Sequence, residues 1–153
     1  LAGLGMTVGN WLGGKIADQT PPIKVMTYAS FSMVLVLSLD ALFVNNIPAM
    51  YVLTFLTAAN AMGIVAPVQM LLIEAAKESP FLGSSIGQSA FNMGNSIGAL
   101  FGGLPLAAGY GLTSSWWTGA ALAAIGIIIV LRLRAVAPKE YQGLPTHGAQ
   151  ALH

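Results

Sequence analysis

Charged side chains are scarce in this sequence. Asp, Glu, Lys and Arg make up 7% of its 153 residues, whereas about a quarter of the residues in a soluble domain are charged. Six basic and five acidic side chains leave a formal net charge of +1. Nucleic-acid binding depends on clustered Lys and Arg that neutralise phosphates, so we expect no nucleic-acid partner. Water is a poor solvent for such a chain.

Cysteine is absent, and the two histidines, His147 and His153, lie near the end of the chain. A disulfide framework, a thiolate nucleophile and a Cys-ligated zinc site are therefore excluded. An enzyme embedded in a membrane would need a nucleophile with a base, or a metal cluster, within its apolar segments. We expect no enzyme, no metal and no cofactor.

Long uncharged segments are what the sequence has instead. Residues 41–73 and 79–131 carry no charge, and about 20 apolar residues suffice for one helical crossing of a bilayer. Polar breaks divide the chain into five predicted spans: 1–17, 23–44, 48–73, 84–109 and 115–131. The pattern predicts an all-α, polytopic membrane helix bundle over residues 1–134. The polar segment 135–153 has no apolar face and is predicted to be a disordered tail.

The basic residues give the bundle an orientation. Short connections make neighbouring spans antiparallel, and this threading puts every basic residue on one side. They are Lys15, Lys24, Lys77, Arg132, Arg134 and Lys139. Loops rich in Lys and Arg face the cytoplasm. We therefore expect a multi-pass protein of the cell (inner) membrane with a cytoplasmic C-terminus.

Glycines recur at four-residue spacing in the first and fourth predicted spans. Lipid provides no hydrophobic force between helices, so close packing at small residues holds them together. We assign this packing role to Gly5, Gly9, Gly13, Gly94 and Gly98. Residues 9–13 and 94–98 share a Gly-Asn-x-apolar-Gly order. That match indicates either an internal duplication or shared packing demands.

Amide side chains are the strongest functional signal. Gln88, Asn92 and Asn95 fall at i, i+4 and i+7 on the fourth span and form one polar stripe. A stripe facing lipid would be costly, so it faces a water-filled cavity, which we favour, or neighbouring helices. The third span contains Asn60, Gln69 and the helix-breaking Pro67, and broken helices are typical of transport paths. The candidate substrate-binding residues are Asn60, Gln69, Gln88, Asn92 and Asn95.

Asp40 is the only acidic residue within a predicted span. At 1.5 Å per residue it lies about 6 Å from the outer end of that span. We expect its carboxylate to reach water at the lipid headgroups.

Residues 9–18, GNWLGGKIAD, resemble the cytoplasmic loop signature of major facilitator transporters, and Gly14, Ala17 and Asp18 match its core. The resemblance implies a gating loop that contains Gly14, Lys15 and Asp18. After Asp18 the family loop often has a glycine and an arginine pair, whereas this chain continues Gln-Thr-Pro-Pro-Ile-Lys. The charge network of that loop is therefore altered here.

Residues 67–70, PVQM, and 90–95, AFNMGN, resemble the drug:proton antiporter group, especially arabinose-efflux-like permeases. The resemblance covers about residues 3–130 and corresponds to helices eight to twelve of twelve. It implies a missing N-terminal half of the same transporter, which carries the proton-binding acids. It also implies that the first and fourth spans meet that half, while the second and fifth are peripheral.

The function expected from these features is secondary active export of sugars or drug-like small molecules by proton antiport with alternating access. The expected partners are a small-molecule substrate, protons, the lipid bilayer and the missing half. An alternative is a non-transporting membrane interaction subunit in which the glycines dock a partner and the amides join helices.

The segregation of the basic residues generates a labelling prediction. Cysteines introduced at Lys77 and Lys139 in the full-length protein should react with an impermeant maleimide only from the cytoplasmic side. A cysteine at Asn46 should react only from the outer side, because the connections alternate across the bilayer. Labelling of the Lys77 position from outside would contradict the topology.

Overall fold

The computed structural model describes residues 1–76 and 78–136, and within them every regular element is an α-helix. The predicted all-α membrane bundle is confirmed in class. The helices are α1 (Ala2–Ala17), α2 (Pro22–Leu42), α3 (Ile47–Gly63), α4 (Val65–Ala75), α5 (Pro80–Ala107) and α6 (Leu112–Val136). Helix α6 includes the first two residues assigned to the tail, and residues 137–153 lie outside the described residues.

Proline and glycine set the helix boundaries. Proline stands in the first turn of α2, α3 and α5, where its missing N–H costs no intrahelical hydrogen bond. At the start of α3 the Asn46 side chain accepts a hydrogen bond from the backbone N–H of Ala49 (3.2 Å), which is an N-cap interaction. The turn between α5 and α6 uses positive φ at Gly109 and Gly111, a conformation that favours glycine.

The third predicted span, residues 48–73, is interrupted, as its helix-breaking Pro67 indicated. It is divided into α3 and α4 at Ile64. Pro67 follows three residues later and cannot donate to the carbonyl of Gly63, four residues before it. Helix breaks at proline are expected for this reason, and Pro67 itself is fully buried.

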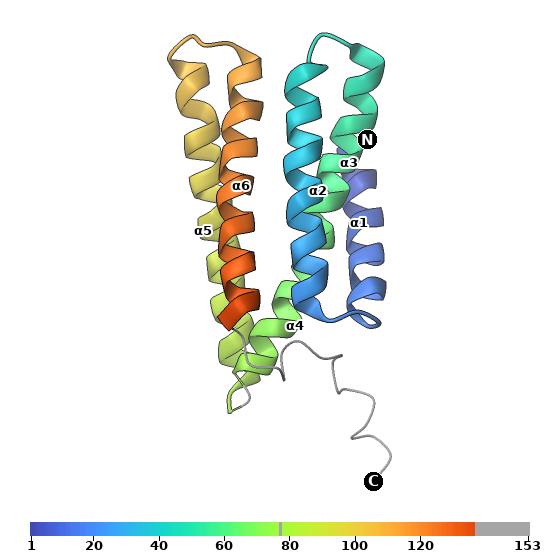
Figure 1. Cartoon of the computed structure of the whole chain (residues 1–153), viewed down its shortest axis with the longest axis vertical. Coiled ribbons are helices and arrows are strands. Elements are labelled where there is room, and N and C mark those ends of the chain that lie inside the picture. Colours follow the sequence, from blue (N-terminus) through green and yellow to red (C-terminus); the bar gives the residue numbers. More distant parts are fainter. Residues whose placement is uncertain (77, 137–153) are drawn as a thin grey trace.

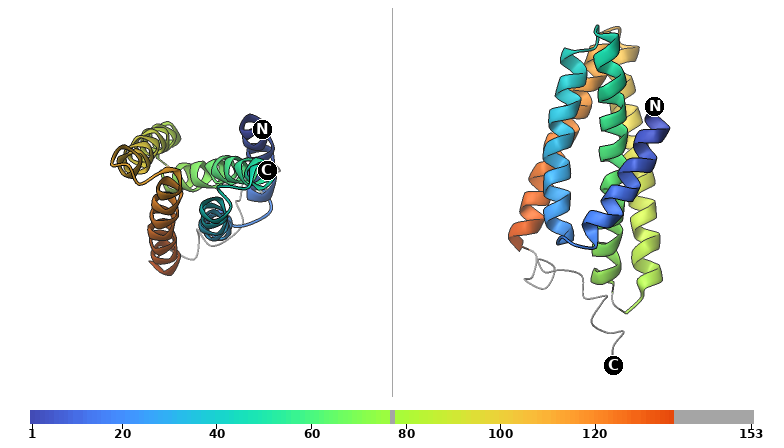
Figure 2. Two further views of the ribbon diagram at one scale, coloured as in Figure 1. Left: turned by 90° about the horizontal axis from the view of Figure 1, so that it is seen from above. Right: turned by 90° about the vertical axis from the view of Figure 1, so that its right-hand side faces the viewer.

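The helices run alternately up and down, except that α4 continues in the direction of α3 (Figure 1). Seen from above, α3 and α4 cross the middle of the bundle, with α1 at one end of this pair and α5 at the other (Figure 2). Helices α2 and α6 pack together on the opposite side. The expectation that the second and fifth predicted spans are peripheral in the whole transporter stays a prediction.

Within residues 1–76 and 78–136, three segments are long and apolar enough to cross a bilayer by length and composition alone: Pro22–Leu42, Ile47–Ala75 and Leu112–Val136. Helix α1 has 16 residues, fewer than the about 20 that a perpendicular crossing needs. Helix α5 has 28 residues but is rich in Gly, Ser and Asn, which lowers its hydropathy. A helix of that composition can span a bilayer only if its polar face avoids lipid.

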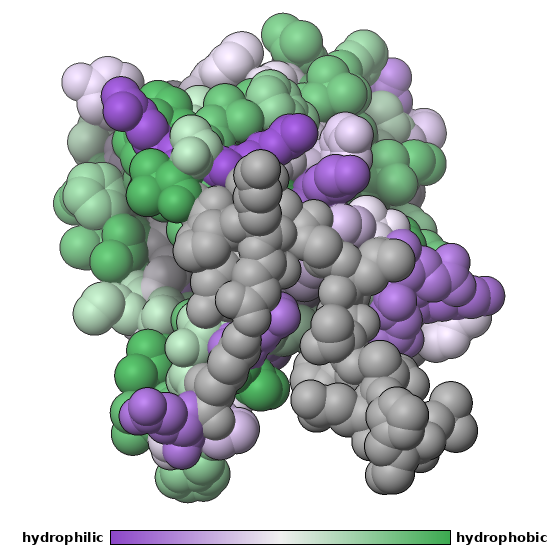
Figure 3. Space-filling view, turned by 60° about the horizontal axis from the view of Figure 1, so that its bottom comes forward, coloured by the Kyte–Doolittle hydropathy of each residue, from purple (hydrophilic) through white to green (hydrophobic). Residues whose placement is uncertain are grey.

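The described basic residues gather at one end of the bundle. Lys15 lies in the last turn of α1, Arg134 in the last turn of α6, and Lys24 near the start of α2. Lys24 and Arg134 also line one small pocket. Figure 3 shows hydrophilic side chains over this end, with hydrophobic ones around it. The common end is as predicted, whereas its orientation toward the cytoplasm stays a prediction.

The glycines of α1 lie against the backbone of α3. Gly5 faces the carbonyl of Phe55, Gly9 faces Ala59, and Gly13 faces Gly63. A Cβ atom built on Gly9 would lie 2.5 Å from the Cα of Ala59, which is far inside van der Waals contact. The three glycines therefore let the two backbones meet, as the small-residue spacing predicted.

The glycines of α5 behave in two ways. Gly83 and Gly87 lie against α4, where a Cβ atom at Gly83 would be 2.7 Å from the carbonyl oxygen of Leu72. Gly94 and Gly98 have no described atom within 4 Å of a built Cβ atom. Their predicted packing role therefore concerns a partner other than the helices described.

The α1–α3 contact generates a stability prediction. Gly9→Ala in the full-length protein should lower the midpoint of thermal unfolding in detergent, because the added methyl group forces α1 away from Ala59. Overpacking of this kind costs about 1–3 kcal/mol. Gly3→Ala is the matched control, since Gly3 is on the same helix and faces open space. Equal midpoints for the two variants would show that the close contact is absent.

Candidate functional site

The predicted polar residues occupy two separate places in the bundle. Asn60 lies in a cavity between α1, α2 and α3. Gln69 lies where α4 meets α5, and the remaining amides continue along α5. Helix α5 packs against α4 and α6, and Asn60 is hydrogen-bonded to α2. The five candidate residues therefore do not form one cluster within the described residues.

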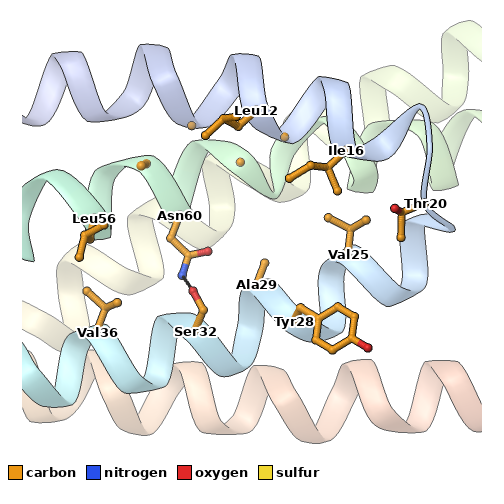
Figure 4. A pocket seen from close by; sticks show the side chains of 14 residues that line it. Leu12, Ile16, Thr20, Val25, Tyr28, Ala29, Ser32, Val36, Leu56 and Asn60 are labelled. Carbon is orange, nitrogen blue, oxygen red and sulfur yellow. Dashed lines mark hydrogen bonds between the residues drawn. The ribbon is translucent and has the colours of Figure 1, made fainter.

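The cavity has a volume of about 530 Å³, which is within the about 300–1,000 Å³ range of small-molecule sites. Its walls are mostly apolar and come from three helices, as Figure 4 shows for Leu12 and Ile16 of α1, Val25 of α2 and Leu56 of α3. Gly9 and Gly13 also line it. Because these glycines leave the backbone uncovered, they contribute to the space as well as to helix packing.

Polar groups in this cavity come mainly from Asn60 and Ser32. The Nδ2 of Asn60 donates a hydrogen bond to the Ser32 hydroxyl oxygen, and the pair joins α3 to α2 (Figure 4). Tyr28 and Thr20 add hydroxyl groups toward the end of the cavity near the α1–α2 turn. An apolar space with a few convergent polar groups is the usual form of a binding site for an organic molecule.

Gln69 has an unusual environment. Its Oε1 is buried and has no hydrogen-bond partner among the described residues. It lies against the backbone of α5, where a Cβ atom built on Gly87 would be 2.9 Å away. A buried amide oxygen without a donor costs about 1–3 kcal/mol. The α4–α5 contact therefore holds a polar atom that a ligand or a rearranged neighbour can satisfy.

The stripe of Gln88, Asn92 and Asn95 is exposed on α5. None of these three side chains has a hydrogen-bond partner among the described residues; the hydrogen bond at Asn92 is accepted by its backbone carbonyl, from Ser96 (3.0 Å). The alternative in which the stripe bonds to neighbouring helices is thus not realised within the described bundle. These amides are available to water, to a ligand or to another part of the protein.

The predicted gating loop lies at the basic end of the bundle. Helix α1 ends at Ala17, and the backbone N–H of Asp18 donates to the carbonyl of Gly14 (3.1 Å). The ammonium of Lys15 lies 5.4 Å from the ring centroid of Trp11, a cation–π geometry one turn apart on the same helix. The Gly14 face is open.

Asp40 does not reach headgroup water, which corrects the sequence-based expectation. Its side chain is fully buried, with 0% of its surface exposed. The Thr57 hydroxyl donates a hydrogen bond to its Oδ2 (2.8 Å), while its Oδ1 is buried without a partner among the described residues. The expectation was wrong because it used the depth of the residue along α2 and not the direction in which its side chain points.

Sequence reasoning missed Ser32 and Thr57, the partners of Asn60 and Asp40. Both pairs join α2 to α3. A single Ser or Thr in an apolar helix is a weak sequence signal, so the sequence did not indicate either partner.

Comparison with known proteins finds relatives that are described as transporters. It is 35% identical over 130 residues to the “Inner membrane transport protein YdhP” of Escherichia coli (strain K12), covering 85% of this chain and 33% of that protein. The same description and values hold for the Escherichia coli O157:H7 protein. It is also 35% identical over 109 residues to the “Putative transporter AraJ” of strain K12, covering 71% of this chain and 28% of that protein. No protein-family model and no solved structure matches the chain.

The helical bundle and these similarities define a membrane-transporter segment. The chain spans about a third of the length of the curated relatives it matches. Over most of its own length the chain is similar to proteins described as an inner membrane transport protein and a putative transporter. These relatives support the transporter resemblance read from residues 9–18 and 90–95.

The Asn60–Ser32 contact can be measured by a double-mutant cycle. Asn60→Ala and Ser32→Ala, alone and combined in the full-length protein, should show a coupling free energy of unfolding of about 0.5–1.5 kcal/mol. Asn60→Ala combined with Ser38→Ala should be additive, because Ser38 bonds to the Val34 carbonyl of its own helix. Additivity in both cycles would show that the α2–α3 hydrogen bond does not form.

Proposed function

We propose that the chain forms part of a secondary active exporter, in which alternating access across a midplane site moves sugars or drug-like small molecules outward in exchange for protons. The observation that carries the proposal is the exposed, unpartnered amide stripe of α5 in a chain similar to inner-membrane transport proteins. Three amides on one helix face are too polar for lipid. They supply donors and acceptors for a polar substrate.

The substrate path in this proposal runs along the side of the bundle that α1, α3–α4 and α5 share. Gln69 and the stripe of Gln88, Asn92 and Asn95 belong to it through α4 and α5. The break at Ile64 supports the assignment, since interrupted helices are common at the binding sites of transporters. In this proposal Asn60 contacts substrate separately from the α5 stripe, in the cavity of about 530 Å³ on the α2 side of α3.

The open faces of Gly94 and Gly98 supply the contact with the remainder of the transporter. Helix pairs that pack through small residues can slide and tilt with little loss of contact, which suits rocking of one half-bundle against the other. The basic end of the bundle faces the cytoplasm in this proposal. The gating loop with Gly14, Lys15 and Asp18, and the C-terminus, then lie on the cytoplasmic side of the inner membrane.

A non-transporting interaction subunit is a second candidate function. The same open faces of Gly94 and Gly98 favour it, because small residues at four-residue spacing also serve to dock a partner helix. The two candidates differ in solute flux. Purified full-length protein in proteoliposomes with an imposed pH gradient should accumulate or release substrate if it is an exporter, and should show no flux above empty liposomes if it only docks a partner.

Asn92 tests the assignment of the stripe. Asn92→Leu keeps a similar volume and deletes the donor and the acceptor, so a role in substrate binding predicts weaker binding with little change in unfolding. Each lost hydrogen bond is worth about 1 kcal/mol, or about fivefold in Kd. The measurement is substrate affinity beside the thermal midpoint in detergent for the full-length protein.

Two further variants control this experiment. Asn92→Ala separates the loss of hydrogen bonds from a change in size, and Asn95→Leu repeats the test at the next position of the stripe. Unchanged affinity together with a lower thermal midpoint would make Asn92 a packing residue and would remove the stripe from the substrate path.

A further inference from the structure

Asp40 is a buried acid that the substrate path described above does not use. It lies two residues before the end of α2, at the end of the bundle opposite the C-terminus of α6. Buried residues of the same helix precede and follow it, namely Leu37 and Ala41. Thr57, its partner, comes from the facing part of α3. The carboxyl group is thus enclosed at the contact between α2 and α3.

The two oxygens of this carboxyl group differ. Oδ2 accepts the hydrogen bond from Thr57 (2.8 Å). Oδ1 is buried from solvent and has no hydrogen-bond donor among the described residues. An ionised carboxylate accepts at both oxygens and is stable in an apolar interior only when a cation or several donors compensate it. A neutral carboxylic acid carries its proton on one oxygen and needs far less compensation. The enclosure therefore fits the neutral form.

No described cation is placed to compensate the charge. On α2 and the helices packed against it, the titratable and charged side chains are Lys15, Lys24, Tyr28, Tyr51, Glu74, Arg132 and Arg134. The basic groups and Glu74 belong to the opposite end of the bundle, where α1, α4 and α6 end and α2 begins. Tyr51 shares the end of Asp40 but is largely exposed on α3. Thr57 is the one described polar group bonded to the carboxyl.

We propose that Asp40 is a proton-binding residue: it is neutral while α2 and α3 are packed as here, with the proton on Oδ1, and it releases that proton when the contact opens. On release the proton passes to water, and the carboxylate that remains keeps the contact apart until it is protonated again. The α2–α3 contact therefore has two states, packed and opened, and the proton concentration shifts the equilibrium between them. The coupling of this step to export rests on the proposed function, whereas proton binding at Asp40 does not.

The sign of the pH effect follows from this assignment. Because the packed arrangement holds one more proton than the opened one, acid stabilises the α2–α3 contact and alkali weakens it. Asp40→Asn imitates the neutral acid and cannot release a proton. The variant should therefore fold, and its α2–α3 contact should no longer respond to pH.

The experiment uses full-length protein in detergent and in proteoliposomes. Infrared spectroscopy should show a carboxylic acid C=O band that disappears in Asp40→Asn and remains in Glu78→Gln, a control at an exposed acid. The thermal midpoint of the native protein should fall with rising pH more steeply than that of Asp40→Asn. Thr57→Val, which removes the donor to Oδ2, should lower the midpoint while keeping the band.

Transport separates this inference from the proposed function. In Asp40→Asn, exchange of labelled for unlabelled substrate should persist. Accumulation driven by a gradient of one pH unit should fall on the order of tenfold, because the proton concentration changes tenfold over one pH unit. Absence of any flux in the native protein would overturn the proposed function, and the infrared band and the midpoints would still decide on Asp40. A band that survives in Asp40→Asn, or equal pH slopes of the midpoints, would overturn proton binding at Asp40. Undiminished gradient-driven accumulation in Asp40→Asn would overturn its coupling to export.

Discussion

The close approach of α1 to α3 is the contact on which the arrangement of this bundle depends. In lipid, apolar side chains gain nothing by leaving one hydrocarbon surface for another, so helices associate through close packing and hydrogen bonds. Gly5, Gly9 and Gly13 bring the α1 backbone directly onto that of α3. The surface facing outward remains apolar, with residues such as Ile128 and Ile129 of α6 more than half exposed. A soluble domain could not tolerate that surface, but a bilayer requires it.

Polar groups inside the bundle occur where two helices must keep a fixed register. Asn60 with Ser32 and Asp40 with Thr57 both join α2 to α3, and no comparable pair of side chains joins α4 to α5 within residues 1–76 and 78–136. There the buried oxygen of Gln69 is left without a donor. The α2–α3 contact is therefore specified by directional bonds, while the α4–α5 contact relies on Gly83 and Gly87.

Helices α1 and α5 share a sequence pattern, but the glycines of that pattern have different neighbours. Residues 9–13 and 94–98 share their glycine and asparagine order, yet Gly9 and Gly13 are covered by α3 while Gly94 and Gly98 are open. The same side chains thus serve for internal packing in α1 and remain available on α5. This difference leaves the Gly94 and Gly98 face of α5 without a described neighbour, which is the basis of the contact proposed for it above.

The sequence alone determined the membrane class, the alternation of the apolar segments and the common end of the described basic residues, because charge scarcity and hydropathy are properties of composition and order. Pro67 indicated the interrupted third segment, but only the tertiary structure located the break at Ile64. Only the tertiary structure showed that Asp40 is buried against Thr57, and that Asn60 and the amides of α5 lie apart. Those facts depend on the direction of a side chain about its helix and on which helix stands opposite, and both are set by packing between segments distant in the chain.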